Sequence, residues 1–195
     1  MPETKHAGPP AQRQTSGPAR AGDPVEAQLA RQIAELTDKV GTPEADYALA
    51  SLRVLEEDWA RHALGVDKSG TLASQARRCV ESRAPLDGLE RALPHASRAV
   101  QWQWALGSFA TGAGEGLAIM AEVRQLETAL AWLHAGIAQH DPGRATRHVA
   151  EARRIAREVR DDSNGSGRYC AASLHALEAL LAGLGEAAGA PPQRH

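Results

Sequence analysis

Arginines without acidic neighbours are the part of this sequence whose type and spacing could do chemistry. Between residues 142 and 160, helical periodicity places arginines on both flanks of an apolar face. On one flank each arginine has a glutamate four residues later, as Arg147 has Glu151, so the charges neutralise one another. The other flank carries Arg153, Arg157 and Arg160, without acids. Because arginine binds phosphate oxygens through several N–H donors, this flank predicts contacts with a nucleic-acid backbone.

Tryptophans supply the second part of such a site. The chain has 4 Trp but only 2 Tyr and 1 Phe, and Trp102 and Trp104 follow closely after Arg98. Proteins that hold single-stranded nucleic acid stack bases on exposed aromatic rings and line the backbone path with arginine. We therefore predict a nucleic-acid site formed by Trp102, Trp104, Arg98 and the arginine flank of residues 153–160. In the alternative interpretation the tryptophans fill the core and the arginines are simply solvated.

Histidines are the candidates for a metal or catalytic site. His62 lies one helical turn after Asp58, while His140 and His148 flank a turn that begins at Asp141. Histidines in such places are more often surface or capping residues than ligands. The sequence has no GxSxG, HExxH or CxxC motif, so we expect no catalytic residue, no bound metal and no cofactor. A small enzyme or ligand-binding bundle that uses His62, His140 or His148 is the third hypothesis.

Composition bounds the class of protein. The chain has 195 residues and a formal net charge of −2, which suits one domain and provides no overall attraction to a polyanion. Cys79 and Cys170 are too few for a disulfide scaffold. No apolar run reaches the roughly 18 to 20 residues that cross a bilayer, and residues 1–22 lack the apolar segment of a signal peptide. We therefore expect a cytoplasmic protein with no membrane contact.

Start and stop signals predict helices throughout residues 23–185. Asp23 and Pro24 open a first helix that ends near Gly41, and Thr42 opens a second that ends near Gly65. Further helices are expected over residues 71–84, 87–110, 117–140, 142–160 and 170–185, with a kink at Pro94. The pattern predicts an all-α fold, either an antiparallel bundle or a short solenoid of six to seven helices, in one domain.

Three glycine-rich or polar segments bound this domain. Residues 111–116 form an expected interior linker, because they contain Gly112, Gly114 and Gly116. Residues 1–22 and 186–195 are rich in glycine, proline and polar residues and offer little to bury against a core. We expect both ends to be disordered tails.

The segment 130–185 resembles a tetratricopeptide-type helix pair. Ala145, Val149 and Ala152 stand where that family's second helix places small packing residues, and Leu174 and Leu177 fit a following first helix. The pattern departs from the family in lacking the usual glycine after the second leucine and in its long loop over residues 161–167. The resemblance implies a helical-repeat adaptor that binds a protein or peptide in a groove formed within residues 117–185.

The helical, Ala- and Arg-rich composition with polar ends resembles the small DNA-damage-response proteins of radiation-resistant bacteria. That resemblance implies a non-enzymatic DNA-binding accessory protein that prefers single strands. We take this as the lead hypothesis, with the arginine flank on phosphates and the tryptophans on bases. The helical-repeat adaptor is the alternative. An exposed apolar helix face would also allow two copies of the chain to associate, so a homodimer is a further possible partner arrangement.

Overall fold

The described part of the chain is helical, as the sequence predicts. The computed structural model describes residues 23–162 and 164–189, with side-chain surroundings as far as Gly185. The α-helices in these ranges are α1 (Pro24–Thr37), α2 (Ala45–Leu64), α3 (Leu72–Glu81), α4 (Leu86–Leu106), α5 (Ala113–His140), α6 (Ala145–Arg160) and α7 (Ala171–Gly189). Two 3-10 helices, η1 (Gly107–Phe109) and η2 (Ser166–Cys170), complete the elements. The all-α prediction is confirmed.

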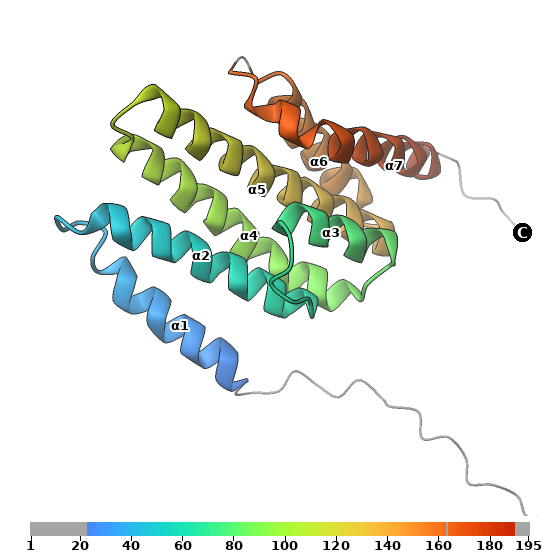
Figure 1. Cartoon of the computed structure of the whole chain (residues 1–195). Coiled ribbons are helices and arrows are strands. Elements are labelled where there is room, and N and C mark those ends of the chain that lie inside the picture. The colour runs from blue at the N-terminus through green and yellow to red at the C-terminus, as the bar shows by residue number, and fades with distance from the viewer. Residues whose placement is uncertain (1–22, 163, 190–195) are drawn as a thin grey trace, which may run out of the picture.

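Four of the helices lie side by side in the order α1, α2, α4 and α5, and neighbours in this row run in opposite directions (Figure 1). α3 packs mainly on α5, α6 packs on α5, and α7 packs on α6. α1 packs mainly on α2 and so lies at the edge of the row. None of the described helices is both long enough and apolar enough to cross a bilayer.

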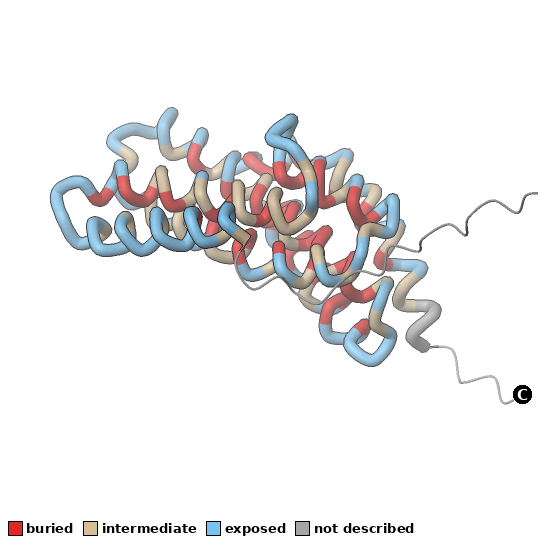
Figure 2. Tube along the Cα trace, turned by 90° about the horizontal axis from the view of Figure 1, so that it is seen from below, coloured by how far each residue is buried: buried red, intermediate tan, exposed pale blue. Residues whose placement is uncertain are grey.

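A continuous cluster of buried apolar side chains joins α2 to α7. Figure 2 shows these buried positions where helices face one another. Trp132 of α5 belongs to the cluster, and its indole N–H donates to Ser173 Oγ at 2.9 Å. Leu29 of α1 and Leu49 of α2 are buried but lie outside the cluster. The α1–α2 pair is therefore at the margin of the core.

Local capping chemistry explains the helix ends that the sequence predicts well. The Asp23 carboxylate accepts a hydrogen bond from the backbone N–H of Val25 at 2.9 Å, and Pro24 occupies the first helical position. Gly65 ends α2 in the left-handed conformation, with φ 67°. The Thr71 side chain caps α3 through the N–H of Ser74. These boundaries follow from single residues and their nearest neighbours.

Other predicted boundaries are wrong because a side chain or a continuing helix overrides the local signal. α5 already begins at Ala113, inside the predicted linker, since the Glu115 carboxylate accepts hydrogen bonds from the N–H and Oγ1 of Thr111 at 2.8 and 3.0 Å. α4 begins at Leu86 and continues through Pro94. α7 continues to Gly189, so residues 186–189 of the predicted tail are helical. The predicted tail at residues 1–22 and the last six residues lie outside the described residues.

Candidate functional site

The arginine flank of α6 is largely used within the fold. Arg160 pairs with Glu178 of α7 at 2.9 Å and with Asp161 at 3.0 Å. Arg153 donates from Nη2 to the backbone oxygen of Leu181 at 2.9 Å. The expectation of a flank without acids is therefore wrong for Arg160, because α7 brings Glu178 across from another part of the chain.

Arg157 differs from Arg160 on this flank. Its Nε donates to the backbone oxygen of Arg153 at 3.3 Å, and no carboxylate among the described residues forms an ion pair with it. The side chain is exposed. Arg153 and Arg157 thus both keep a charge without a carboxylate partner among the described residues, and of these two Arg157 is the one that lines a hollow with Trp104.

Arg98 lies in a different network, between α2 and α4. Its Nε donates to Oε1 of Glu56 at 2.7 Å, and Nδ1 of His95 lies 2.6 Å from Oε2 of the same carboxylate. Glu56 is completely buried, and Trp59 stacks on the His95 ring at 4.1 Å. Burial by itself raises the pKa of Glu56, but the hydrogen bonds and charges of His95 and Arg98 outweigh it and lower that pKa. Arg98 therefore neutralises a buried acid.

The two predicted tryptophans have unlike surroundings, because residues two apart on a helix point in different directions. Trp102 is partly buried, and its indole nitrogen is buried without a hydrogen-bond partner among the described residues. Trp104 is 45% exposed, its Nε1 donates to Glu127 at 3.3 Å, and the guanidinium of Arg124 lies 5.6 Å from its ring centroid. Of the two, Trp104 is the more exposed to solvent.

Trp104 and Arg157 meet in a hollow of about 760 Å³ between α4, α5 and α6, which we call the Trp104 hollow. Its lining residues are Trp104, Arg124, Glu127, Arg154, Arg157, Glu158, Asp161 and Asp162. Most of the charges are paired: Arg124 contacts Glu127 at 2.6 Å, and Arg154 contacts Glu158 at 2.6 Å. The structure thus brings together two of the six predicted residues, in a setting that is close to neutral.

A larger and more apolar hollow lies between α1 and α2, and sequence reasoning missed it. This α1–α2 groove has a volume of about 860 Å³. Its lining residues are Gln32, Glu35, Leu36, Asp38, Lys39, Tyr47, Ala50, Ser51, Arg53, Val54 and Leu55. Tyr47 and Val54, seven residues apart on α2, are 66% and 43% exposed. Their spacing on one helical face was the signal in the sequence.

The lining of the α1–α2 groove contains two acidic and two basic residues, and only the acidic ones are without an ion pair among the described residues. Glu35 and Asp38 are exposed, and neither forms an ion pair within the described part of the chain. The two basic residues of the lining are engaged: Lys39 contacts Glu44 at 3.7 Å, and Arg53 contacts Glu57 at 2.6 Å. The groove therefore combines an apolar floor with negative charge.

Within residues 117–185, the hollow closest in volume to the α1–α2 groove is the Trp104 hollow, but the seven lining residues that it takes from this range are all charged. The hollow between Leu117 and Tyr169 has about 350 Å³, and the one beside Arg160 and His175 has about 310 Å³. Each is less than half the size of the α1–α2 groove. A groove for a protein partner therefore fits better at the other end of the helix row.

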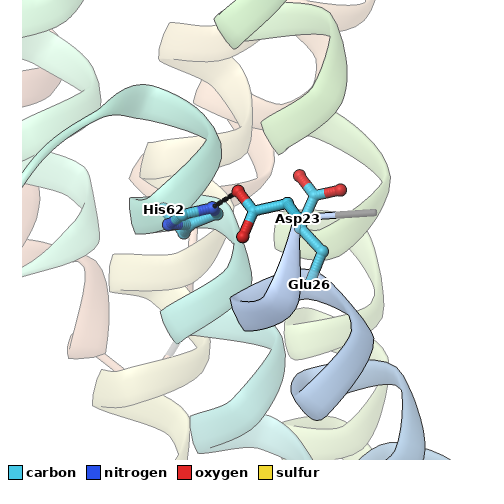
Figure 3. Close-up of side chains that lie close together, drawn as sticks. All are labelled: Asp23, Glu26 and His62. Carbon is cyan, nitrogen blue, oxygen red and sulfur yellow. Dashed lines mark hydrogen bonds and ion pairs between the residues drawn. The ribbon is translucent and has the colours of Figure 1, made fainter. Parts of the chain in front are cut away.

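The histidines have partners that the sequence did not indicate. His62 hydrogen-bonds Asp23 rather than Asp58, with Nε2 and Oδ2 2.8 Å apart, and Glu26 points toward the same place (Figure 3). Nδ1 of His148 lies 2.8 Å from Nδ1 of His134, so the two rings share one proton. Burial and the neighbouring His148 lower the pKa of His134 to about 4.

Comparisons with known proteins identify no relative. The chain matches no protein-family model, no curated protein and no solved structure. The two hollows and the charges around them are therefore the features of the molecule that indicate a function.

Proposed function

We propose that this protein is a non-enzymatic interaction protein whose α1–α2 groove binds a basic amphipathic helix of a partner protein. The observation that supports this proposal is an apolar groove of about 860 Å³ with Glu35 and Asp38 at its rim. Exposed apolar side chains gathered in one concave place are typical of protein-binding surfaces. The proposal keeps the adaptor function expected from the sequence but places its site on α1 and α2.

The spacing on α2 supports a helix as the occupant. Tyr47, Ala50 and Val54 recur at three- and four-residue intervals along the groove, which is how a helix presents anchors to another helix. Tyr47 and Val54 are separated by about 10 Å along the helix axis, so a partner needs roughly two to three turns. Lysines or arginines beside its apolar stripe would face Glu35 and Asp38, which favours association with the correct partner.

A direct test uses two designed fluorescent peptides of about 14 residues with the same leucine stripe. One carries lysines on the flanks of the stripe and the other carries glutamates. We expect fluorescence anisotropy to detect binding of the lysine peptide only. Tyr47→Ala should weaken binding at least about tenfold, because aromatic anchors dominate such interfaces. Val54→Glu should abolish it, because it buries an unpaired charge next to Glu35.

Tyr169→Ala is the matched control, because this ring is 65% exposed but lies on η2, away from the groove. The Tyr169→Ala variant should bind the lysine peptide with the same affinity as the unmodified chain. Unchanged affinity after Val54→Glu, or equal binding of the two peptides, would refute the proposal. Sedimentation measurements separate another outcome: if Val54→Glu converts a dimer to a monomer, the groove is a homodimer interface and the partner-helix proposal is wrong.

Single-stranded DNA binding is the second candidate function. The observation that favours it is the exposed ring of Trp104 beside Arg157, which has no carboxylate partner among the described residues. A base stacked on this ring would place its phosphate near Arg157. We rank this function second because the four carboxylates of the Trp104 hollow are paired with arginines and leave it close to neutral, which provides little attraction for a polyanion.

The salt dependence of DNA binding gives this candidate a sharp test. If Arg157 is the one arginine that contacts phosphate, the logarithm of the DNA-binding constant should fall with the logarithm of the salt concentration at a slope of about −0.7. Contacts from three arginines would give a slope of about −2. Arg157→Ala should remove that slope, and Trp104→Ala should weaken binding by about 1–3 kcal/mol and remove the quenching of Trp emission. Arg31→Ala, an exposed arginine on α1, is the control. No binding of a labelled oligonucleotide at low salt would exclude this function.

A further inference from the structure

We propose that Asp23, Glu26 and His62 form a metal site that binds Zn²⁺ and links the start of α1 to the end of α2. One ligand atom from each residue lies within 4.8 Å of the other two. The residues come from the start of α1 and the end of α2, and Figure 3 shows the Asp23 carboxylate facing His62 with the Glu26 side chain beside Asp23. This inference is independent of the proposed function, because the α1–α2 groove is lined by the opposite ends of these helices.

The donor set is the first argument for zinc. Two carboxylates and one imidazole are ligands that Zn²⁺ accepts in sites completed by water, whereas Ca²⁺ and Mg²⁺ prefer oxygen donors alone. Zinc–ligand distances of about 2.0–2.2 Å place tetrahedral donors about 3.3 Å apart. The Nε2 of His62 and the Oδ2 of Asp23 are already 2.8 Å apart, so these side chains need only small shifts.

Each ligand can be recruited without losing its structural role. Asp23 caps α1 through Oδ1, which accepts from the N–H of Val25, and its other oxygen, Oδ2, faces His62. Glu26 contacts Arg91 at 2.9 Å, but Arg91 also lies 3.7 Å from Asp87. Arg91 can therefore turn to Asp87 when Glu26 binds the ion, and an exposed ion pair of this kind contributes little.

The surrounding charges favour a cation at this position. The two carboxylates neutralise a divalent ion. His62 lies in the last turn of α2, where the helix dipole is negative and offsets the positive start of α1.

The test is titration of the full chain with ZnCl₂ in competition with a chromophoric chelator, and with CoCl₂ as a spectroscopic probe. We expect one ion per chain and the visible absorption of tetrahedral Co²⁺. Asp23→Asn is the most informative variant, because asparagine caps a helix as well as aspartate but lacks the charge. It and His62→Ala should each weaken zinc binding at least about tenfold. His175→Ala, an exposed histidine on α7, should leave it unchanged.

Arg91→Gln separates a metal site from a merely structural cluster. It removes the competitor for Glu26, so it should increase zinc affinity while slightly lowering the Tm of the metal-free chain. At a zinc concentration about a hundredfold above the dissociation constant, the Tm of the unmodified chain should rise by about 5–10 °C. Failure to bind one ion per chain, affinity that His62→Ala leaves unchanged, or weaker binding in Arg91→Gln would overturn the proposal.

Discussion

Glu56→Gln should destabilise the fold, because Glu56 is a buried anion that joins α2 to α4. Its carboxylate is completely buried and accepts from Nδ1 of His95 at 2.6 Å and from Nε of Arg98 at 2.7 Å. Glutamine has nearly the same shape but no charge, and its amide N–H groups would face a donor. The variant therefore removes charge-assisted hydrogen bonds without creating a cavity.

The expected loss of unfolding free energy is about 3 kcal/mol. A hydrogen bond to a charged group contributes about 1.5–3 kcal/mol. The hydrogen bond from His95 contributes the full free energy because both groups are buried. The side chain of Arg98 is 40% exposed, so water can hydrate it when the bond to Glu56 is lost. Its share is therefore discounted. For a chain of this length, about 3 kcal/mol corresponds to a Tm lower by roughly 6–12 °C.

The assay is urea unfolding of the unmodified chain and of Glu56→Gln at several pH values. Because the pKa of Glu56 is lowered in the fold, the folded state favours the anion and its contribution is present above the usual glutamate range. It is lost as the pH falls through the lowered value. The difference between the two proteins should therefore shrink in acid. A difference below about 0.5 kcal/mol at pH 7, or one that does not change with pH, would contradict this reasoning.

Further predictions concern glycines and histidines. Gly136→Ala should cost about 1–3 kcal/mol in urea unfolding, because a Cβ there would lie 2.7 Å from a methyl of Val80. Gly183→Ala on α7, where a Cβ meets nothing within 4 Å, should instead gain about 0.5–1 kcal/mol. The pKa of His134 is lowered to about 4 by burial and by His148, so the folded state resists protonation and stability should fall between about pH 6.5 and 4. His134→Gln should remove most of that fall, which unfolding at pH 7 and pH 4.5 can measure.

The amino-acid sequence by itself determines the fold class and many helix ends. Apolar residues at helical spacing and the caps at Asp23, Gly65 and Thr71 act within one or two turns, so they can be recognised without knowing the rest of the fold. The start of α5 is predicted wrongly although the bond between Glu115 and Thr111 is equally local, because the three glycines of residues 111–116 favour a linker.

Only the tertiary structure decides which candidate residues are available to a ligand. The sequence identifies Arg98 and Arg160 as charges, but Glu56 and Glu178, which bind them, come from other helices. An ion pair depends on distance in space, and sequence spacing predicts that distance only within one helix. For the same reason the sequence does not predict the α1–α2 groove or the approach of Asp23 to His62. Each depends on the angle at which two helices pack, and no local sequence pattern determines that angle.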